Sequence, residues 1–159
     1  MPNYYDSIAE GYNELHGAEQ ARKARKILDQ IELNENSKIL DVGGGTGIAT
    51  EFFPGDITIL DPCGGLLSKV KGKKVLGSAE SLPFPDKSFD LAISLTAIHH
   101  YDDPEKALSE MKRVSRKYVA VTALKKSKKH NELCELIRKM LPSSFELNDS
   151  HDSIFVCKN

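Results

Sequence analysis

The chain has 159 residues, of which 40% are hydrophobic and 28% are charged, and its formal net charge is −1. This length and composition are typical of one globular domain with one core, and they exclude a disordered chain. The near-neutral charge argues against a general electrostatic binder of nucleic acid. No apolar run approaches the roughly 20 residues that a membrane-spanning helix needs.

The three cysteines, Cys63, Cys134 and Cys157, are odd in number and far apart, and they form no CxxC pair. This spacing argues against a disulfide framework and against a zinc site, so we expect no metal. The polar and aromatic N-terminus lacks the apolar core of a signal peptide. We therefore expect a cytoplasmic protein.

The predicted elements alternate between helices and strands. The first is a helix over residues 18–31, in which apolar residues recur at helical spacing and Lys and Arg fill the other face. In the first half of the chain, the elements that follow are a strand at 38–42, a short helix at 48–53 that ends before Pro54, a strand at 57–60, a weak helix at 64–71 and a strand at 73–77.

The second half continues this alternation. Asp103, Pro104 and Glu105 open a helix, because Asp is a good N-cap, Pro suits the first helical position and an acid suits the first turn. The other predicted elements are strands at 89–95 and 117–124, a helix at 127–141, and strands at 145–147 and 153–157.

The predicted strands are almost entirely apolar, which is expected when both faces of a sheet are covered. The order of elements predicts a doubly wound α/β fold with a Rossmann-like, mostly parallel sheet in three α/β/α layers. The last two strands are expected to close it as an antiparallel hairpin. We expect a single domain over residues 1–159.

The stretch ILDVGGGTG at 39–47 follows the first predicted strand. Ligands of such sheets bind at the carboxyl ends of the strands, where a glycine loop lets the backbone approach closely. Its spacing is Gly43, Gly45 and Gly47, and Ile48 stands where the dinucleotide fingerprint would have its third glycine. Asp41 before the loop would repel a pyrophosphate but favours an ammonium or sulfonium. The pattern favours S-adenosylmethionine over NAD; the alternative is a tight turn without a ligand.

The chain resembles the class I S-adenosylmethionine-dependent methyltransferases, most of all the type 11 branch that resembles the ubiquinone-biosynthesis enzymes. The resemblance rests on motifs in the family's order: ILDVGGGTG, the ILDP of residues 59–62, and the segment 77–114 that begins GSAESLPFPDKSFDLAISLTAIHHYDDP. It covers most of the chain and implies S-adenosylmethionine as the cofactor.

The resemblance also implies roles for single residues. Asp61, followed by Pro62, would accept hydrogen bonds from the ribose hydroxyls, although a turn Asp before a proline is the alternative. The backbone of Gly43 and Gly45 would pack on the methionine part of the cofactor, with Asp41 below it. Further cofactor contacts would come from Ser78, Ala79 and Glu80 at the adenine and from Leu95 and Thr96 at the methionine end.

Two of these assignments carry an alternative. Ser78 stands where the family usually has Asp, so we expect Glu80 or backbone groups to meet the adenine amine. Tyr5 and Tyr12 resemble aromatic residues that fold over the cofactor in the family, and ordinary helix packing is an equal alternative for both.

His99 and His100 follow the predicted strand 89–95, at the rim of the expected site. A histidine there could act as a general base or orient the acceptor, whereas a structural histidine is the alternative. Because two adjacent side chains on a turn seldom both face a site, we expect at most one of them to act. The resemblance favours His100.

The methyl acceptor is less defined than the cofactor. Only the predicted helix 127–141 lies where many relatives insert a cap, and this favours an open site with a minimal cap. A small-molecule acceptor is slightly favoured. An RNA or protein acceptor is the alternative, with a homodimer or partner subunit completing the pocket and KKSKK (125–129) as an attractive surface, although a solvated helix start explains that run better. The remaining alternatives are a non-catalytic scaffold that binds the cofactor and a nicotinamide oxidoreductase.

Overall fold

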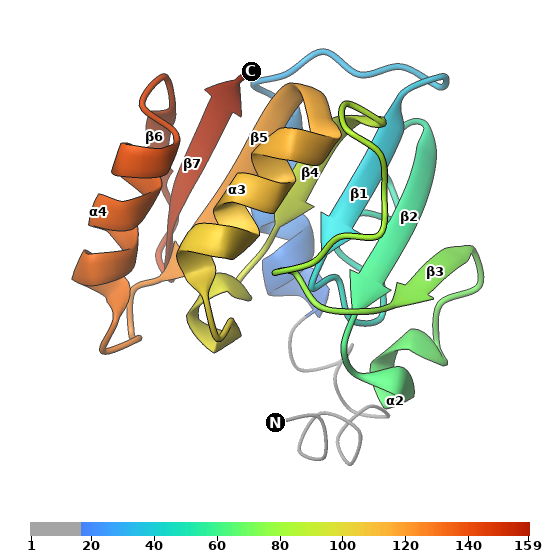
Figure 1. Cartoon of the computed structure of the whole chain (residues 1–159), viewed down its shortest axis with the longest axis horizontal. Coiled ribbons are helices and arrows are strands. Elements are labelled where there is room, and N and C mark those ends of the chain that lie inside the picture. Colours follow the sequence, from blue (N-terminus) through green and yellow to red (C-terminus); the bar gives the residue numbers. More distant parts are fainter. Residues whose placement is uncertain (1–16) are drawn as a thin grey trace.

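The computed structural model describes residues 17–159. In this part of the chain, seven strands form one sheet in the order β3-β2-β1-β4-β5-β7-β6 (Figure 1). The strands are β1 (Lys38–Val42), β2 (Asp56–Asp61), β3 (Lys73–Leu76), β4 (Phe89–Ser94), β5 (Ser115–Leu124), β6 (Phe145–Asn148) and β7 (Asp152–Lys158). Strands β1 to β5 pair in parallel, and β7 is antiparallel to both β5 and β6. The predicted sheet and its C-terminal hairpin are confirmed.

Helices cover both faces of this sheet. The described part of the N-terminal helix comprises residues 17–28 and lies behind the sheet in Figure 1, where α3 (Pro104–Val114) and α4 (His130–Met140) lie in front. The other helical segments are α2 (Gly64–Leu67) and the 3₁₀ turn η1 (Ile98–His100). The three predicted layers are confirmed. No helix in residues 17–159 is long and apolar enough to cross a membrane.

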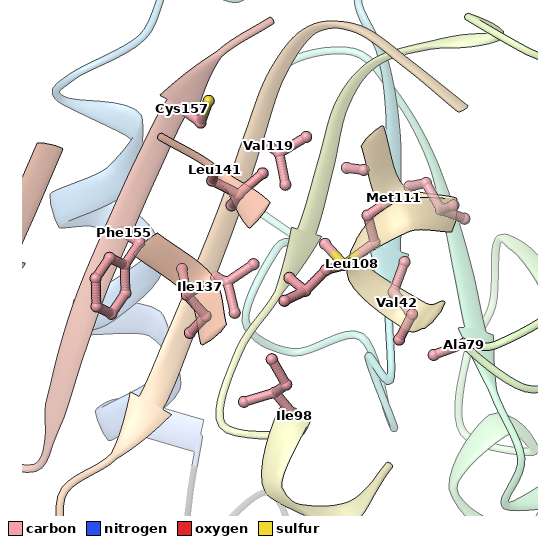
Figure 2. Close-up of a cluster of buried hydrophobic side chains, with 14 of the residues drawn as sticks. Val42, Ala79, Ile98, Leu108, Met111, Val119, Ile137, Leu141, Phe155 and Cys157 are labelled. Carbon is pink, nitrogen blue, oxygen red and sulfur yellow. The ribbon is translucent and has the colours of Figure 1, made fainter. Parts of the chain in front are cut away.

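The apolar strands are buried because their two faces pack into two different cores. In β4, Ala92 belongs to the core under α3 and α4, whereas Leu91 and Ile93 belong to the core under the N-terminal helix. Figure 2 shows the first of these cores, in which Leu108 and Met111 of α3 lie near Val42 of β1. Alternate residues of one apolar strand therefore serve opposite layers, as the two-sided sheet requires.

The start of α3 follows from its first residues. Asp103 is the N-cap, and its Oδ1 accepts a hydrogen bond of 3.0 Å from the backbone N–H of Lys106. Pro104 occupies the first turn, where its missing N–H costs nothing, and Glu105 follows it. This cap fixes the residue at which α3 begins, after the segment that follows β4.

The prediction of a helix at residues 48–53 is wrong, because the structure has turns at 48–52. Four of these six residues are Ile, Thr or Phe, which are only modest helix formers, and Pro54 prevents the segment from continuing as a helix. Phe53 N–H bonds to the Thr50 carbonyl at 2.9 Å, which closes a single turn. The predicted helix at 64–71 is shorter than expected, since α2 ends at Leu67.

The N-terminal helix also departs from its predicted pattern. Lys23 was expected on its solvated face, but the residue is 0% exposed. Its ammonium group pairs with Asp152, which lies in β7 and is also 0% exposed. A charged partner far away in the sequence therefore brings this lysine into the core.

Candidate active site

A cavity of about 270 Å³ opens at the carboxyl ends of the parallel strands. It lies beside β1, where the strand order reverses, because β2 and β3 extend to one side of β1 and β4 and β5 to the other. Doubly wound sheets bind ligands at this position. Nine of the residues predicted for the site line the cavity: Gly43, Asp61, Pro62, Ser78, Ala79, Glu80, Leu95, Thr96 and His100.

The glycine loop brings its backbone to the wall of this cavity. Gly43 has a φ of 69°, and a Cβ atom added there would lie 2.9 Å from both the Ala97 Cβ and the Tyr101 hydroxyl. A side chain at this position is therefore excluded both by the backbone conformation and by the lack of space. Gly45 and Gly47 do not line the cavity; Gly45 instead contacts Asp61, and Gly47 lies against Ile59.

Asp61 at the end of β2 is held by two backbone N–H groups. Its Oδ2 accepts a hydrogen bond of 3.0 Å from Gly45 N–H, and its Oδ1 accepts one of 2.8 Å from Cys63 N–H. The residue is 7% exposed and lines the cavity. A carboxylate oxygen accepts more than one hydrogen bond, so these contacts orient the group without exhausting it.

Asp41 lies beneath the glycine loop and does not line the cavity. Its Oδ2 accepts a hydrogen bond of 2.9 Å from the Thr50 hydroxyl, whereas no hydrogen-bond partner for its Oδ1 exists within residues 17–159. Burial raises the pKa of Asp41 to about 7; the Thr50 hydrogen bond opposes this shift and the Asp61 charge adds to it. The loop thus encloses a carboxyl group whose Oδ1 atom accepts no hydrogen bond from the described residues.

The loop after β3 supplies the opposite wall. Ser78, Ala79 and Glu80 all line the cavity there. Burial raises the pKa of Glu80, and the carboxylates of Asp102 and Asp103 raise it further. Acidic groups from two different loops therefore face the same space.

Tyr101 is a cavity residue that the sequence reading missed. Its hydroxyl lies 2.7 Å from Ser94 Oγ and donates a hydrogen bond of 3.2 Å to the Val42 carbonyl. Burial raises the pKa of Tyr101 well above its ordinary value, so the hydroxyl keeps its proton. The side chain ties the end of β4 to the end of β1.

The two adjacent histidines are placed differently. His100 lines the cavity, whereas His99 does not. Burial lowers the pKa of both, that of His99 to about 4, so both rings are neutral near pH 7. The Nδ1 atom of His99 is buried and has no hydrogen-bond partner among the described residues. A neutral His100 can accept a proton at the cavity.

The remaining predicted residues, Tyr5 and Tyr12, lie outside the described residues. The sequence reading also missed Asp102, Cys63 and Leu66, which line the cavity. Tyr101 and Asp102 follow the two histidines directly, so the same argument about the end of strand 89–95 could have included them. Within residues 17–159, no group of three or more His, Cys, Asp or Glu residues is placed to hold a metal ion.

Charge gives the cavity its chemical character. Asp61, Glu80 and Asp102 line it, and Asp41 lies below, but among the described residues no Lys or Arg lines it. Such a lining attracts a cation and repels a pyrophosphate. These acidic side chains therefore fit S-adenosylmethionine, which carries a sulfonium and an ammonium, better than a nicotinamide dinucleotide.

A family model described as a methyltransferase domain matches residues 40–122. The chain is 37% identical over 123 residues to 2-methyl-6-phytyl-1,4-hydroquinone methyltransferase of Spinacia oleracea, covering 69% of this chain and 34% of that protein. It is 31% identical over 124 residues to demethylmenaquinone methyltransferase of Renibacterium salmoninarum, covering 70% of this chain and 52% of that protein. The chain thus spans about a third to a half of the length of these curated relatives.

Among solved structures, one similar chain belongs to the Haloferax volcanii complex between the Trm112 methyltransferase activator and a methyltransferase. The TM-score is 0.75 at 19% sequence identity, and the alignment covers 92% of this chain and 79% of that one. This likeness concerns the fold. The family match over more than half of the chain shows more: the protein belongs to the methyltransferase domain family, the class I S-adenosylmethionine-dependent methyltransferases that its motifs resemble.

Proposed function

We propose that this chain binds S-adenosylmethionine in the cavity beside β1 and transfers its methyl group to a small-molecule acceptor. The observation that carries the proposal is the acidic lining of Asp61, Glu80 and Asp102, without a Lys or Arg from the described residues, at the strand ends where such folds bind ligands. The family supplies methyl transfer as the reaction type.

Each wall of the cavity has a role in this proposal. Asp61, already oriented by two N–H groups, accepts from the ribose hydroxyls. Gly43 lets the backbone come close to the methionine part, and Asp41 lies below the loop, where its raised pKa leaves the carboxyl group only partly ionised at neutral pH. Glu80 and the backbone beside it meet the adenine. Pro62, Ser78, Ala79, Leu95 and Thr96 complete the proposed cofactor site, with Tyr5 and Tyr12 as candidates outside the described residues. Gly45 and Gly47 do not line the cavity, and we propose that they support the site by shaping the glycine loop.

The protein's part in the reaction is largely positioning. When bound, S-adenosylmethionine would supply an electrophilic methyl group: the acceptor would form its new bond to that carbon as the carbon–sulfur bond breaks, and S-adenosylhomocysteine would depart. The chain has to align the acceptor, exclude water and, where the acceptor must lose a proton, accept it. Neutral His100 on the cavity wall is our candidate for that base, and His99, which does not line the cavity, is the weaker one.

The relatives suggest which acceptors to try first. Two of them are named for a 1,4-hydroquinone and for demethylmenaquinone, so we propose an aromatic quinol or a ring of similar size as the acceptor class. We further propose a single domain with a minimal cap, supported by the segment between β5 and β6, where α4 is the one helix. A cavity with so little cover suits an acceptor that enters from solvent.

A second arrangement is a macromolecular acceptor or a partner subunit. The similar Haloferax volcanii structure comes from a complex with an activator, which motivates a search for such a partner or for a homodimer. The basic run 125–129 gives less support than the sequence suggested. Lys125 is engaged within the chain, since its ammonium donates to the Asp149 carbonyl at 2.7 Å.

For the compartment we propose the cytoplasm. The three cysteines of the chain are free thiols, and all are buried. Free thiols are typical of proteins in a reducing compartment.

The test of the proposed function is calorimetric titration of the purified chain with S-adenosylhomocysteine, with NADH as the control. We expect binding of the first and none of the second. Binding of NADH alone would overturn the cofactor assignment. Labelled S-adenosylmethionine is then incubated with quinols and with cell extract. Methyl transfer to an acceptor would support the proposed enzymatic activity, whereas cofactor binding without transfer to any acceptor would favour a non-catalytic scaffold.

A further inference from the structure

A lysine lies fully buried at the edge of the cavity wall. Lys23 of the N-terminal helix is 0% exposed, and its Nζ atom lies 2.6 Å from Thr96 Oγ1 and 3.0 Å from Asp152 Oδ1. Glu19 lies one helical turn earlier, with its Oε1 at 3.3 Å from the same Nζ. Three acceptors therefore surround the three hydrogens of the ammonium group.

The other members of this group also converge on Thr96. The Thr96 hydroxyl donates a hydrogen bond of 2.8 Å to Asp152 Oδ2, and its backbone N–H donates one of 2.7 Å to Thr122 Oγ1. Asp152 and Thr122 are both 0% exposed. Contacts from the N-terminal helix, from β5 and from β7 thus fix one residue that follows β4.

Thr96 has an unusual backbone for its residue type. Its φ is 51°, in the left-handed region, where a β-branched side chain is strained. The residue lines the cavity together with its neighbours Leu95 and Ala97. A strained conformation of this kind persists only when its surroundings hold it in place.

Stability alone is a poor explanation for this arrangement. A fully buried ion pair loses the solvation of two charges, and apolar residues of similar volume often serve the fold as well or better. What apolar residues cannot do is donate to and accept from the hydroxyl of Thr96. The value of the pair therefore lies in what it orients.

We propose that Lys23 and Asp152 are positioning residues that hold Thr96 in its left-handed conformation, so that the segment 96–101 closes one wall of the methyl-donor site. The inference rests on the proposed function for its ligand. Neither charged group touches the cavity; both act through Thr96, which reverses the chain after β4 and leads to His100 and Tyr101.

Two substitutions at position 96 distinguish an effect of the Thr96 backbone conformation from a direct contact between its hydroxyl and the ligand. Thr96→Val keeps the shape but removes every hydrogen bond of the hydroxyl, whereas Thr96→Gly removes the same bonds and makes the left-handed conformation easy. We expect both variants to weaken S-adenosylhomocysteine binding, Thr96→Val by about tenfold or more and Thr96→Gly by clearly less, because glycine adopts the left-handed conformation without strain. Equal losses in both would mean that the hydroxyl itself contacts the ligand and would overturn the proposal.

The charged pair is tested by replacing both partners, because removing one would leave the other buried and alone. The double variant Lys23→Met with Asp152→Asn, in which neither partner carries a charge (the charge-free variant), is expected to lose affinity as Thr96→Val does, and adding Thr96→Gly is expected to recover part of that loss. Arg116→Met is the control, since it breaks the Arg116–Asp90 ion pair near the start of β4. An unchanged affinity in the charge-free variant, with only its unfolding temperature lowered, would show a purely structural role.

Amide hydrogen exchange without ligand supplies a readout independent of the proposed function. In the charge-free variant, residues 96–101 are expected to exchange faster than in the wild type, whereas Arg116→Met leaves them unchanged. If the wild type binds no S-adenosylhomocysteine, the proposed function fails, and the exchange result alone decides whether Lys23 and Asp152 hold this segment. Unaltered exchange would overturn the inference even if the cofactor binds.

Discussion

The backbone N–H of Gly45 donates a hydrogen bond of 3.0 Å to the Oδ2 atom of Asp61. This contact joins the glycine loop after β1 to the acid that ends β2, and the Gly43 N–H adds a bond of 2.7 Å to the Leu60 carbonyl. Loop and strand end therefore form one rigid corner of the cavity. A carboxylate fixed in this way is prepared to receive a ligand without first paying to order its side chain.

The Asp61→Ala variant is expected to weaken S-adenosylhomocysteine binding at least about tenfold, or roughly 1.4 kcal/mol, because charged hydrogen bonds are lost. Asp56→Ala is the matched control, since Asp56 begins the same strand and pairs with Lys73 at the surface. Calorimetric titration measures both. If the two variants bind as the wild type does, Asp61 is not part of the site.

The folded protein is expected to lose stability between about pH 4 and pH 7, because burial raises the pKa of Asp41 from 3.8 to about 7. In that range the unfolded chain has released this proton and the folded chain still holds it, so unfolding becomes more favourable as pH rises. Below both pKa values, and again above them, the contribution is constant. Urea unfolding across this range measures the slope.

Replacing Asp41 identifies the group responsible for this slope. In Asp41→Asn nothing titrates at this position. The difference between its free energy of unfolding and that of the wild type should therefore shift in favour of the variant by roughly 3 kcal/mol as the pH rises from about 4.5 to 8. Parallel pH profiles for the two proteins would contradict the assignment. Thr50→Val is a useful comparison, because it removes the hydroxyl that donates to Asp41 while leaving the carboxyl group in place.

Tyr101→Phe is expected to lower the free energy of unfolding by about 1–2 kcal/mol, because it deprives Ser94 and the Val42 carbonyl of a buried partner. The ring remains, so the affinity for S-adenosylhomocysteine should change little. Tyr118→Phe, which removes a longer contact of 3.4 Å with the Glu32 N–H, should cost less. Urea unfolding of both variants tests the ranking, and equal losses would refute it.

His100→Ala is expected to lower the rate of methyl transfer while leaving the affinity for S-adenosylhomocysteine nearly intact, since His100 lines the cavity as a neutral base. His99→Ala is the internal control, because this side chain does not line the cavity. Turnover with a quinol acceptor and calorimetric affinity are measured for both. A greater loss of turnover in His99→Ala would indicate that His99, and not His100, is the base.

Much of the fold could be predicted because its signals are local. Apolar runs with both faces buried indicated the strands, and Asp103 before Pro104 indicated the start of α3. The predicted helix at 48–53 failed because most residues there are Ile, Thr or Phe, which are only modest helix formers, and Pro54 ends the segment. The candidate site was predicted from one rule, that parallel strands bring their carboxyl ends together. Tyr101 was missed among the cavity residues because it lies a few residues beyond the strand end.

By itself, the sequence determined the order of the strands, the family and several of the residues at the strand ends, since strands and motifs are recognised from neighbours within a few positions. Only the tertiary structure decided that Lys23 is buried. Helical periodicity assigns a lysine to solvent, and the partner that reverses this assignment, Asp152, lies 129 residues further along the chain. No local pattern contains that pairing, because it arises only when the N-terminal helix packs beside β7 and the chain turns left-handed at Thr96.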